Sequence, residues 1–156
     1  MPAYVGAVLA EQQAVISLLM RRLRAAEYES VADAETLVRA LFGHLKVAEH
    51  LLLPAFVTSR HFASAKAALG LAVAHLAAAV AEQQRTGSLT SYAQLDQSVP
   101  MLFAAEGLLL HDATKTELHA LSGLGQQAEE EFTLLIGRAD LFNDVRQTPA
   151  GGEPTP

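Results

Sequence analysis

The strongest chemical signal in this chain of 156 residues comes from its histidines, because the chain has no cysteine. Without cysteine there is no thiol nucleophile, no disulfide and no thiolate ligand for zinc or for an iron–sulfur cluster. Any bound metal would therefore depend on imidazole and carboxylate side chains. The six histidines are His44, His50, His61, His75, His111 and His119.

Three of the histidines share a face of a predicted helix with apolar residues at steps of three, four or seven. These neighbours include Leu37 and Leu41 for His44, Ala68 and Leu71 for His75, and Ala104 and Leu108 for His111. Each histidine lies roughly eleven to thirteen residues into its helix, so a rise of about 1.5 Å per residue brings the three to similar depth in an antiparallel bundle. We expect the three imidazoles to meet near mid-height.

The first predicted helix adds a polar side chain at the same level. Gln12 lies on the apolar stripe of that helix, between Val8 and Val15. A buried amide needs hydrogen-bond partners, so we expect a polar group opposite it. Gln12 or a water molecule could complete a tetrahedron with the three imidazoles around one divalent ion. Glu106 is the best-placed acid near such a site, and its alternative position is the edge of the bundle.

A second interpretation of His44, His75 and His111 stays open. A histidine on an apolar helix face is commonly a neutral, hydrogen-bonded core residue, and three at similar depth could be what remains of a site that has lost its metal. For the other histidines we expect exposed or interfacial positions near polar neighbours; these are His50, His61 and His119.

The segments that must position these side chains have helix composition, with Ala and Leu dominant and Ile only twice in the chain. Helices are predicted over residues 3–27, from Ser30 or Asp33 towards Ser59, over 62–86, and from Ser98 to Leu121. Pro54 should kink or shorten the second helix, and Gly87 should end the third. For the fourth, Ser91 is the alternative start; Ser98 is favoured because Pro100 then lies in the first turn.

Four main helices with short connections predict an all-α fold, an up-down-up-down four-helix bundle. After Gly123 and Gly125, a short fifth C-terminal helix is expected from Gln126 to Phe142. Residues 1–146 would form the single domain and residues 147–156 a disordered tail.

Composition and charge exclude several classes of protein. Hydrophobic residues make up 51% of the chain and charged residues 18%, which is too apolar for a disordered protein. The formal net charge of −6, with scattered basic residues, argues against a nucleic-acid partner. The longest apolar stretch, 67–81, contains His75 and is shorter than a bilayer span. We therefore expect a cytoplasmic protein with no membrane partner.

The segment from His44 to Pro54, His-Leu-Lys-Val-Ala-Glu-His-Leu-Leu-Leu-Pro, resembles the second helix of the hemerythrin-like family, the bundles often called HHE cation-binding domains. It keeps the histidine, an acid at Glu49, the leucine run and the proline at the family's spacing. Gln12 takes the place of the family's first-helix histidine, while His75 and His111 match those of the third and fourth helices. The resemblance covers residues 5–142 and implies a helical bundle that handles oxygen, nitric oxide, peroxide or iron.

The chain departs from the family at the positions that bridge two irons. The bridging acid of the second helix falls on Ala48, and that of the fourth on Lys115 or Thr116. Without these anions the burial of two iron ions would cost too much, so a di-iron centre is not expected. Glu49 cannot replace the missing acid directly, because five residues turn it about 140° away from His44. The remaining candidate metal ligands are His44, His75, His111, Gln12 and Glu49.

Two functions are consistent with the sequence. The first is a hemerythrin-like bundle that binds a single iron or other divalent metal ion, or none, through histidines; its enzyme version would carry out redox chemistry on a small oxidant. The alternative is a metal-free bundle that acts as a homo-oligomeric interaction or regulatory protein. The high apolar content leaves spare apolar surface, so a homodimer is expected. Its candidate contact residues are Phe56, Val57 and Phe62.

Overall fold

The computed structural model describes residues 5–113, and every regular element in that range is a helix. Four elements are long: α1 (Val5–Ala25), α2 (Val31–Val47), α4 (Phe62–Thr86) and α5 (Leu95–His111). A π-helical turn (Ala48–Leu52) and the short α3 (Leu53–Ala55) follow α2, and a 3₁₀ turn (Thr90–Gln94) precedes α5. The predicted all-α class is confirmed for this part of the chain. The expected fifth helix at 126–142 and the tail at 147–156 lie outside it.

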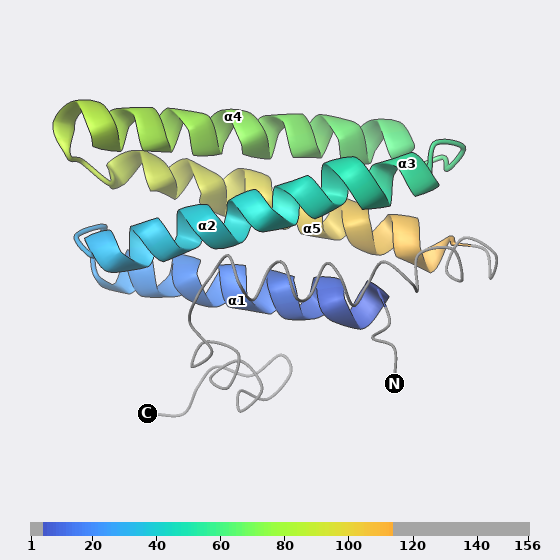
Figure 1. The fold of residues 1–156 in the computed structure, drawn as a ribbon, viewed down its shortest axis with the longest axis horizontal. Helices are drawn as coiled ribbons and strands as arrows, with labels where there is room; N and C mark the ends of the chain where they lie inside the picture. The colour runs from blue at the N-terminus through green and yellow to red at the C-terminus, as the bar shows by residue number, and fades with distance from the viewer. Residues whose placement is uncertain (1–4, 114–156) are drawn as a thin grey trace.

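The four long helices lie side by side along the long dimension of the molecule (Figure 1). α1 packs mainly on α2, and α4 packs mainly on α5, so neighbours in sequence are neighbours in space. Buried aliphatic side chains from all four helices form the core between them, including Ile16, Leu37, Ala72 and Leu102. This core surrounds the side chains discussed below.

The ends of the helices follow the expected local signals. Ser30, rather than Asp33, caps α2, because its Oγ accepts a hydrogen bond from the Asp33 N–H at 3.3 Å. Gly87 ends α4 in the left-handed conformation, with φ of 78°, which glycine adopts without steric cost. Its N–H donates to the Gln83 carbonyl at 2.8 Å.

The π-turn after α2 has a physical cause in Pro54. Proline lacks an N–H, and its ring clashes with the carbonyl four residues earlier in a regular helix. Here the helix widens just before the proline, and the Leu53 N–H donates to the Ala48 carbonyl, five residues back. The helical path then ends at Ala55, before Ser59. The predicted interruption at Pro54 therefore takes the form of a π-turn followed by an early end.

The fourth long helix differs from the prediction at both ends. α5 begins at Leu95 rather than Ser98, and it ends at His111 rather than near Leu121. Pro100 consequently lies inside the helix, not in its first turn. This is tolerated because Pro100 is exposed, so the backbone bond that it cannot make lies on the solvent side, where water can satisfy the carbonyl.

Candidate functional site: a buried polar cluster and an apolar groove

Polar side chains from three helices meet in the middle of the core. Gln12 comes from α1, His44 from α2 and Glu106 from α5, and none of the three is more than 1% exposed. The half-buried Gln13 joins them from α1. We refer to these four residues as the central cluster. The apolar periodicity of each helix brings them inward, because each lies on the stripe that faces the core.

His44 is held by hydrogen bonds at both ring nitrogens. Nδ1 lies 2.8 Å from the Gln12 Oε1, and Nε2 lies 2.8 and 2.9 Å from the two carboxyl oxygens of Glu106. With Gln12 Oε1 as acceptor, Nδ1–H is the donor. Neither nitrogen is therefore left open for a metal ion or for a nucleophile that would need a base.

Glu106 is paired where it lies. Its two carboxyl oxygens lie 2.8 and 2.9 Å from His44 Nε2, so the imidazole and the carboxyl group are joined by a buried hydrogen bond. Gln13 Nε2 donates to Glu106 Oε1 at 3.0 Å. Such pairing is what permits a carboxyl group in an apolar core, because an unpaired buried charge is very costly. The alternative position considered for Glu106, at the edge of the bundle, is wrong.

One polar atom of the cluster is left over. Gln12 Nε2 is buried and has no hydrogen-bond partner among the described residues. Whichever way the amide faces, only one of its two polar atoms can meet His44 Nδ1, so the other stays unsatisfied. The ring of Phe103 closes the site, edge-on to His44 at a centroid distance of 5.3 Å. The expectation of a polar group opposite Gln12 is confirmed, and that group is His44.

The other expected metal ligands do not join His44. His75 is half-buried on α4, and its Nδ1 forms a hydrogen bond with the Ser98 Oγ at 2.9 Å. His111, the last residue of α5, is exposed, as is Glu49 in the π-turn. Within residues 5–113, no group of three or more His, Cys, Asp or Glu side chains is placed to hold a metal ion.

For His111 the expected depth is wrong, because α5 ends at this residue and places it at the end of the bundle rather than at mid-height. For His75 the reason lies in rotation about the helix axis. His75 follows Ala74 and precedes the buried Leu76, and each step along an α-helix turns a side chain by about 100°. The face of α4 that enters the core is centred on Ala72, Leu76 and Ala79, which directs His75 sideways, towards Ser98 of α5. The residues present therefore do not fit a three-histidine metal site.

The remaining histidines lie away from the core. His50 is exposed. His61, in the turn before α4, places its Nε2 2.9 Å from the Asp112 Oδ2, and Arg60 Nε donates to the same oxygen at 2.8 Å. The Arg60 hydrogen bond is the main reason that the pKa of Asp112 lies below its ordinary value of 3.8, with a smaller contribution from His61. His119 lies outside the described residues.

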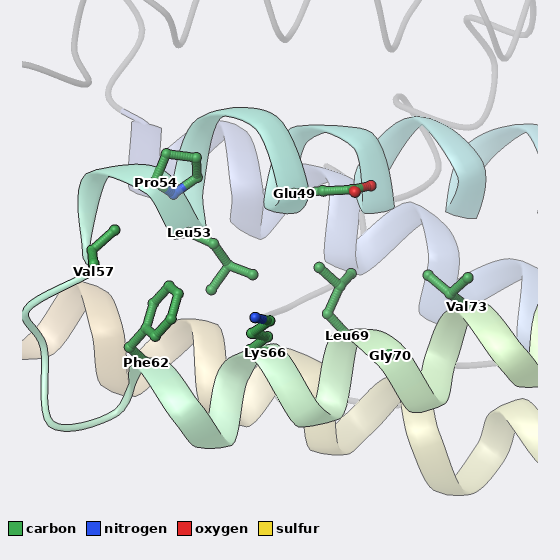
Figure 2. A pocket seen from close by; sticks show the side chains of 9 residues that line it. All are labelled: Glu49, Leu53, Pro54, Val57, Phe62, Lys66, Leu69, Gly70 and Val73. Atoms are coloured by element: carbon green, nitrogen blue, oxygen red, sulfur yellow. The ribbon is translucent and has the colours of Figure 1, made fainter.

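A groove opens between the π-turn and the first half of α4 (Figure 2). Its volume is about 570 Å³, which is in the range of small-molecule sites. Its walls are mostly apolar, with one acid and one base: Glu49, Leu53, Pro54, Val57, Phe62, Lys66, Leu69, Gly70 and Val73. We refer to it as the α4 groove. No sequence pattern indicated this groove beyond Val57 and Phe62, which were expected as contact residues.

The side of α4 that faces away from the core is also apolar. It carries small residues and one leucine, all exposed: Ala67, Gly70, Leu71, Ala74, Ala78 and Ala81. We refer to these six as the outer face of α4, which joins the α4 groove at Gly70. By length and composition, α4 is the one helix in the described part of the chain that could cross a membrane; its most apolar window has a mean hydropathy of 1.5 and is 33% buried.

Comparison with known proteins adds no assignment, since neither a family model, nor a curated protein, nor a solved structure matches this chain.

Proposed function

We propose that this protein is a metal-free, up-down-up-down helical bundle that functions by self-association through α4. The observation that carries the proposal is that α4, the one described helix both long and apolar enough to cross a membrane, lies largely outside the core, with only 33% of its most apolar window buried. Leu71 and Val73 are 39% and 44% exposed, although both are large aliphatic residues in the middle of a 25-residue helix. Contiguous exposed apolar surface of this kind is typical of an interface.

The chemistry of the outer face favours another helix as its partner. Alanine and glycine leave little side chain between two backbones, which allows helix axes to approach closely over several turns. α4 is about 37 Å long at 1.5 Å per residue, so two copies side by side would share a long contact. A stable dimer buries about 800 Å² on each partner, and the groove beside the outer face adds to the available area.

The expected contact residues differ in how well they suit this role. Val57 is 59% exposed, and Phe62 is half-buried in the wall of the groove, so both can meet a partner. Phe56 is only 1% exposed. Its ring is part of the core, because α3 ends there and turns the side chain inward, so Phe56 is withdrawn as a contact residue.

In this function the central cluster is structural. Its hydrogen bonds connect α1, α2 and α5 at one level. If any one of these helices slid or rotated, a buried polar group would lose its hydrogen-bond partner. A buried polar pair of this kind can select one register among several apolar packings. The cluster would thereby hold α5 in a constant position, and α5 is the helix on which α4 mainly packs.

The metal-binding function is tested by elemental analysis of protein prepared without a nickel column or a His tag. We expect less than about a tenth of an equivalent of iron, zinc or manganese per chain, and an unchanged melting temperature after chelation, because His44 has no open nitrogen. About one equivalent of metal that is lost in a His44→Ala variant would contradict the metal-free assignment.

Self-association is tested by light scattering on the full chain with a matched pair of variants. One chain has a mass of 16.6 kDa, so a dimer of the wild type doubles that value. Ala74→Glu places a charge in the outer face of α4, and Ala104→Glu makes the same change on an exposed position of α5. We expect Ala74→Glu to be monomeric and Ala104→Glu to stay dimeric. A monomeric wild type at about 100 μM, far above the dissociation constants of stable complexes, would overturn the proposal.

A further inference from the structure

The α4 groove contains two opposite charges that have no partner among the described residues. Lys66 and Glu49 both line the groove, and within residues 5–113 neither forms a hydrogen bond or an ion pair. Figure 2 shows the Lys66 side chain rising from α4 into the groove, and the Glu49 side chain extending from the π-turn on the opposite wall. Each charge therefore faces an apolar space without a counter-ion from its own wall.

We infer that the α4 groove is the centre of a two-fold interface, in which Lys66 of each protomer pairs with Glu49 of the partner subunit. The inference rests on the self-association proposed above and specifies its geometry. The partner copy would give Lys66 and Glu49 each an ion pair that neither forms among residues 5–113.

The presence of both charges is what identifies a second copy as the occupant. A two-fold interface brings the same patch of both chains together, so residue i of one chain meets residue j of the other, and j meets i. A patch with one cation and one anion satisfies this rule, because the two copies together form two cation–anion pairs. A patch with a single sign of charge would repel its own copy.

Other occupants leave part of the groove unsatisfied. An alkyl carboxylate such as decanoate would match Lys66 and the apolar walls, but it would bring a second negative charge towards Glu49. An uncharged apolar helix would cover both charges without pairing either one, which is costly. The groove is also continuous with the outer face of α4 through Gly70, so one partner can cover both surfaces.

The test is a charge swap measured by sedimentation or light scattering on the full chain. In Lys66→Glu the two attractive pairs become two repulsive ones, and the same holds for Glu49→Lys. We expect each single variant to raise the dimer dissociation constant by about 30-fold or more. Lys46→Glu, an equal change of charge on an exposed position of α2, is the control and should leave the constant within about threefold.

Two recoveries distinguish paired charges from simple disruption. The double variant Lys66→Glu/Glu49→Lys restores attraction in both pairs and is expected to dimerise again. An equimolar mixture of the two single variants should also recover, since each variant supplies what the other needs. Circular dichroism of each single variant checks that it remains folded, and a single variant that unfolds is replaced by Lys66→Gln and Glu49→Gln, for which a smaller loss is expected.

The outcomes separate this inference from the proposed function. A dimer that is broken by Ala74→Glu but unaffected by Lys66→Glu, or a double variant and a mixture that both stay monomeric, would overturn the paired charges and leave self-association intact. A monomeric wild type would overturn both. A monomer that binds decanoate in a manner that depends on Lys66 would make the groove a ligand site instead.

Discussion

The centre of this molecule is polar and the outside of α4 is apolar, which is the reverse of the usual arrangement in a helical bundle. At the centre, Gln12, His44 and Glu106 are almost fully buried, where a helical bundle ordinarily has aliphatic side chains. On α4, the groove and the outer face expose aliphatic and alanine side chains, where a surface helix ordinarily has charged ones. The two regions differ in whether their unusual side chains find partners among the described residues.

The buried region is nearly complete, whereas the exposed one is not. Every polar atom of His44 and Glu106 has a partner, and only Gln12 Nε2 lacks one among the described residues of the cluster. On the α4 surface, the described residues neither pair the charges of the groove nor cover its apolar area. An internal polar site with nearly all its hydrogen bonds formed is suited to holding a structure together, and an exposed apolar surface is suited to meeting a partner.

The largest effect is expected from breaking the central pair. Glu106→Leu leaves His44 Nε2 buried without a partner, and the loss of one member of a buried pair typically costs about 3–5 kcal/mol. The double variant His44→Leu/Glu106→Leu should recover most of this loss, because an apolar pair leaves only the glutamines unpaired. Urea denaturation followed by circular dichroism measures both. A single variant that costs less than about 1 kcal/mol would show that the cluster is not buried as described.

A pair of truncations on α4 compares its two sides directly. Leu76→Ala removes a buried side chain and should cost about 2–5 kcal/mol, whereas Leu71→Ala removes an exposed one and should cost less than about 1 kcal/mol. Both are measured in the Ala74→Glu background, so that any contact across a dimer does not contribute. Equal losses at the two positions would mean that Leu71 is covered within a single chain.

A smaller loss is expected at the rim of the core, where His75 is bonded to Ser98. Ser98→Ala removes the hydrogen bond that holds His75 Nδ1 and should lower the free energy of unfolding by about 1 kcal/mol. Ser64→Ala, on the exposed part of α4, serves as the control and should have little effect. If the two variants are equally stable, the Ser98 bond does not help to orient His75.

The smallest effect concerns the exposed counterpart of the central pair, formed by Asp112 with Arg60 and His61. Arg60→Gln removes the principal cause of the lowered pKa, so the pKa of Asp112 should rise towards its ordinary value of 3.8. A carboxyl pKa that is lower in the folded state contributes stability above the unfolded-state pKa, and this contribution is lost as the pH falls through the folded-state pKa. Carboxyl NMR titration measures the change. A pKa that is unaffected by Arg60→Gln would mean that the guanidinium is not held against Asp112 in solution.

The helical class and the inward faces of α1 and α2 could be predicted from sequence alone. Gln12 and His44 repeat with aliphatic residues at steps of three and four, and both are buried in the structure. The caps at Ser30 and Gly87 could be predicted for the same reason, because a cap depends on a few neighbouring residues. The start of α5 could not, since Pro100 is tolerated inside the helix only where its side of the helix faces solvent.

The sequence by itself determined that the chain is helical and which residues share a face, because helix periodicity is a local property. Only the tertiary structure decided that Glu106 meets His44, that His75 turns to Ser98 and that α4 keeps an apolar surface outside. The rotation of each helix about its axis depends on packing with helices far away in the sequence. A rotation of about 100°, one residue, is enough to exchange a ligand position for a rim position.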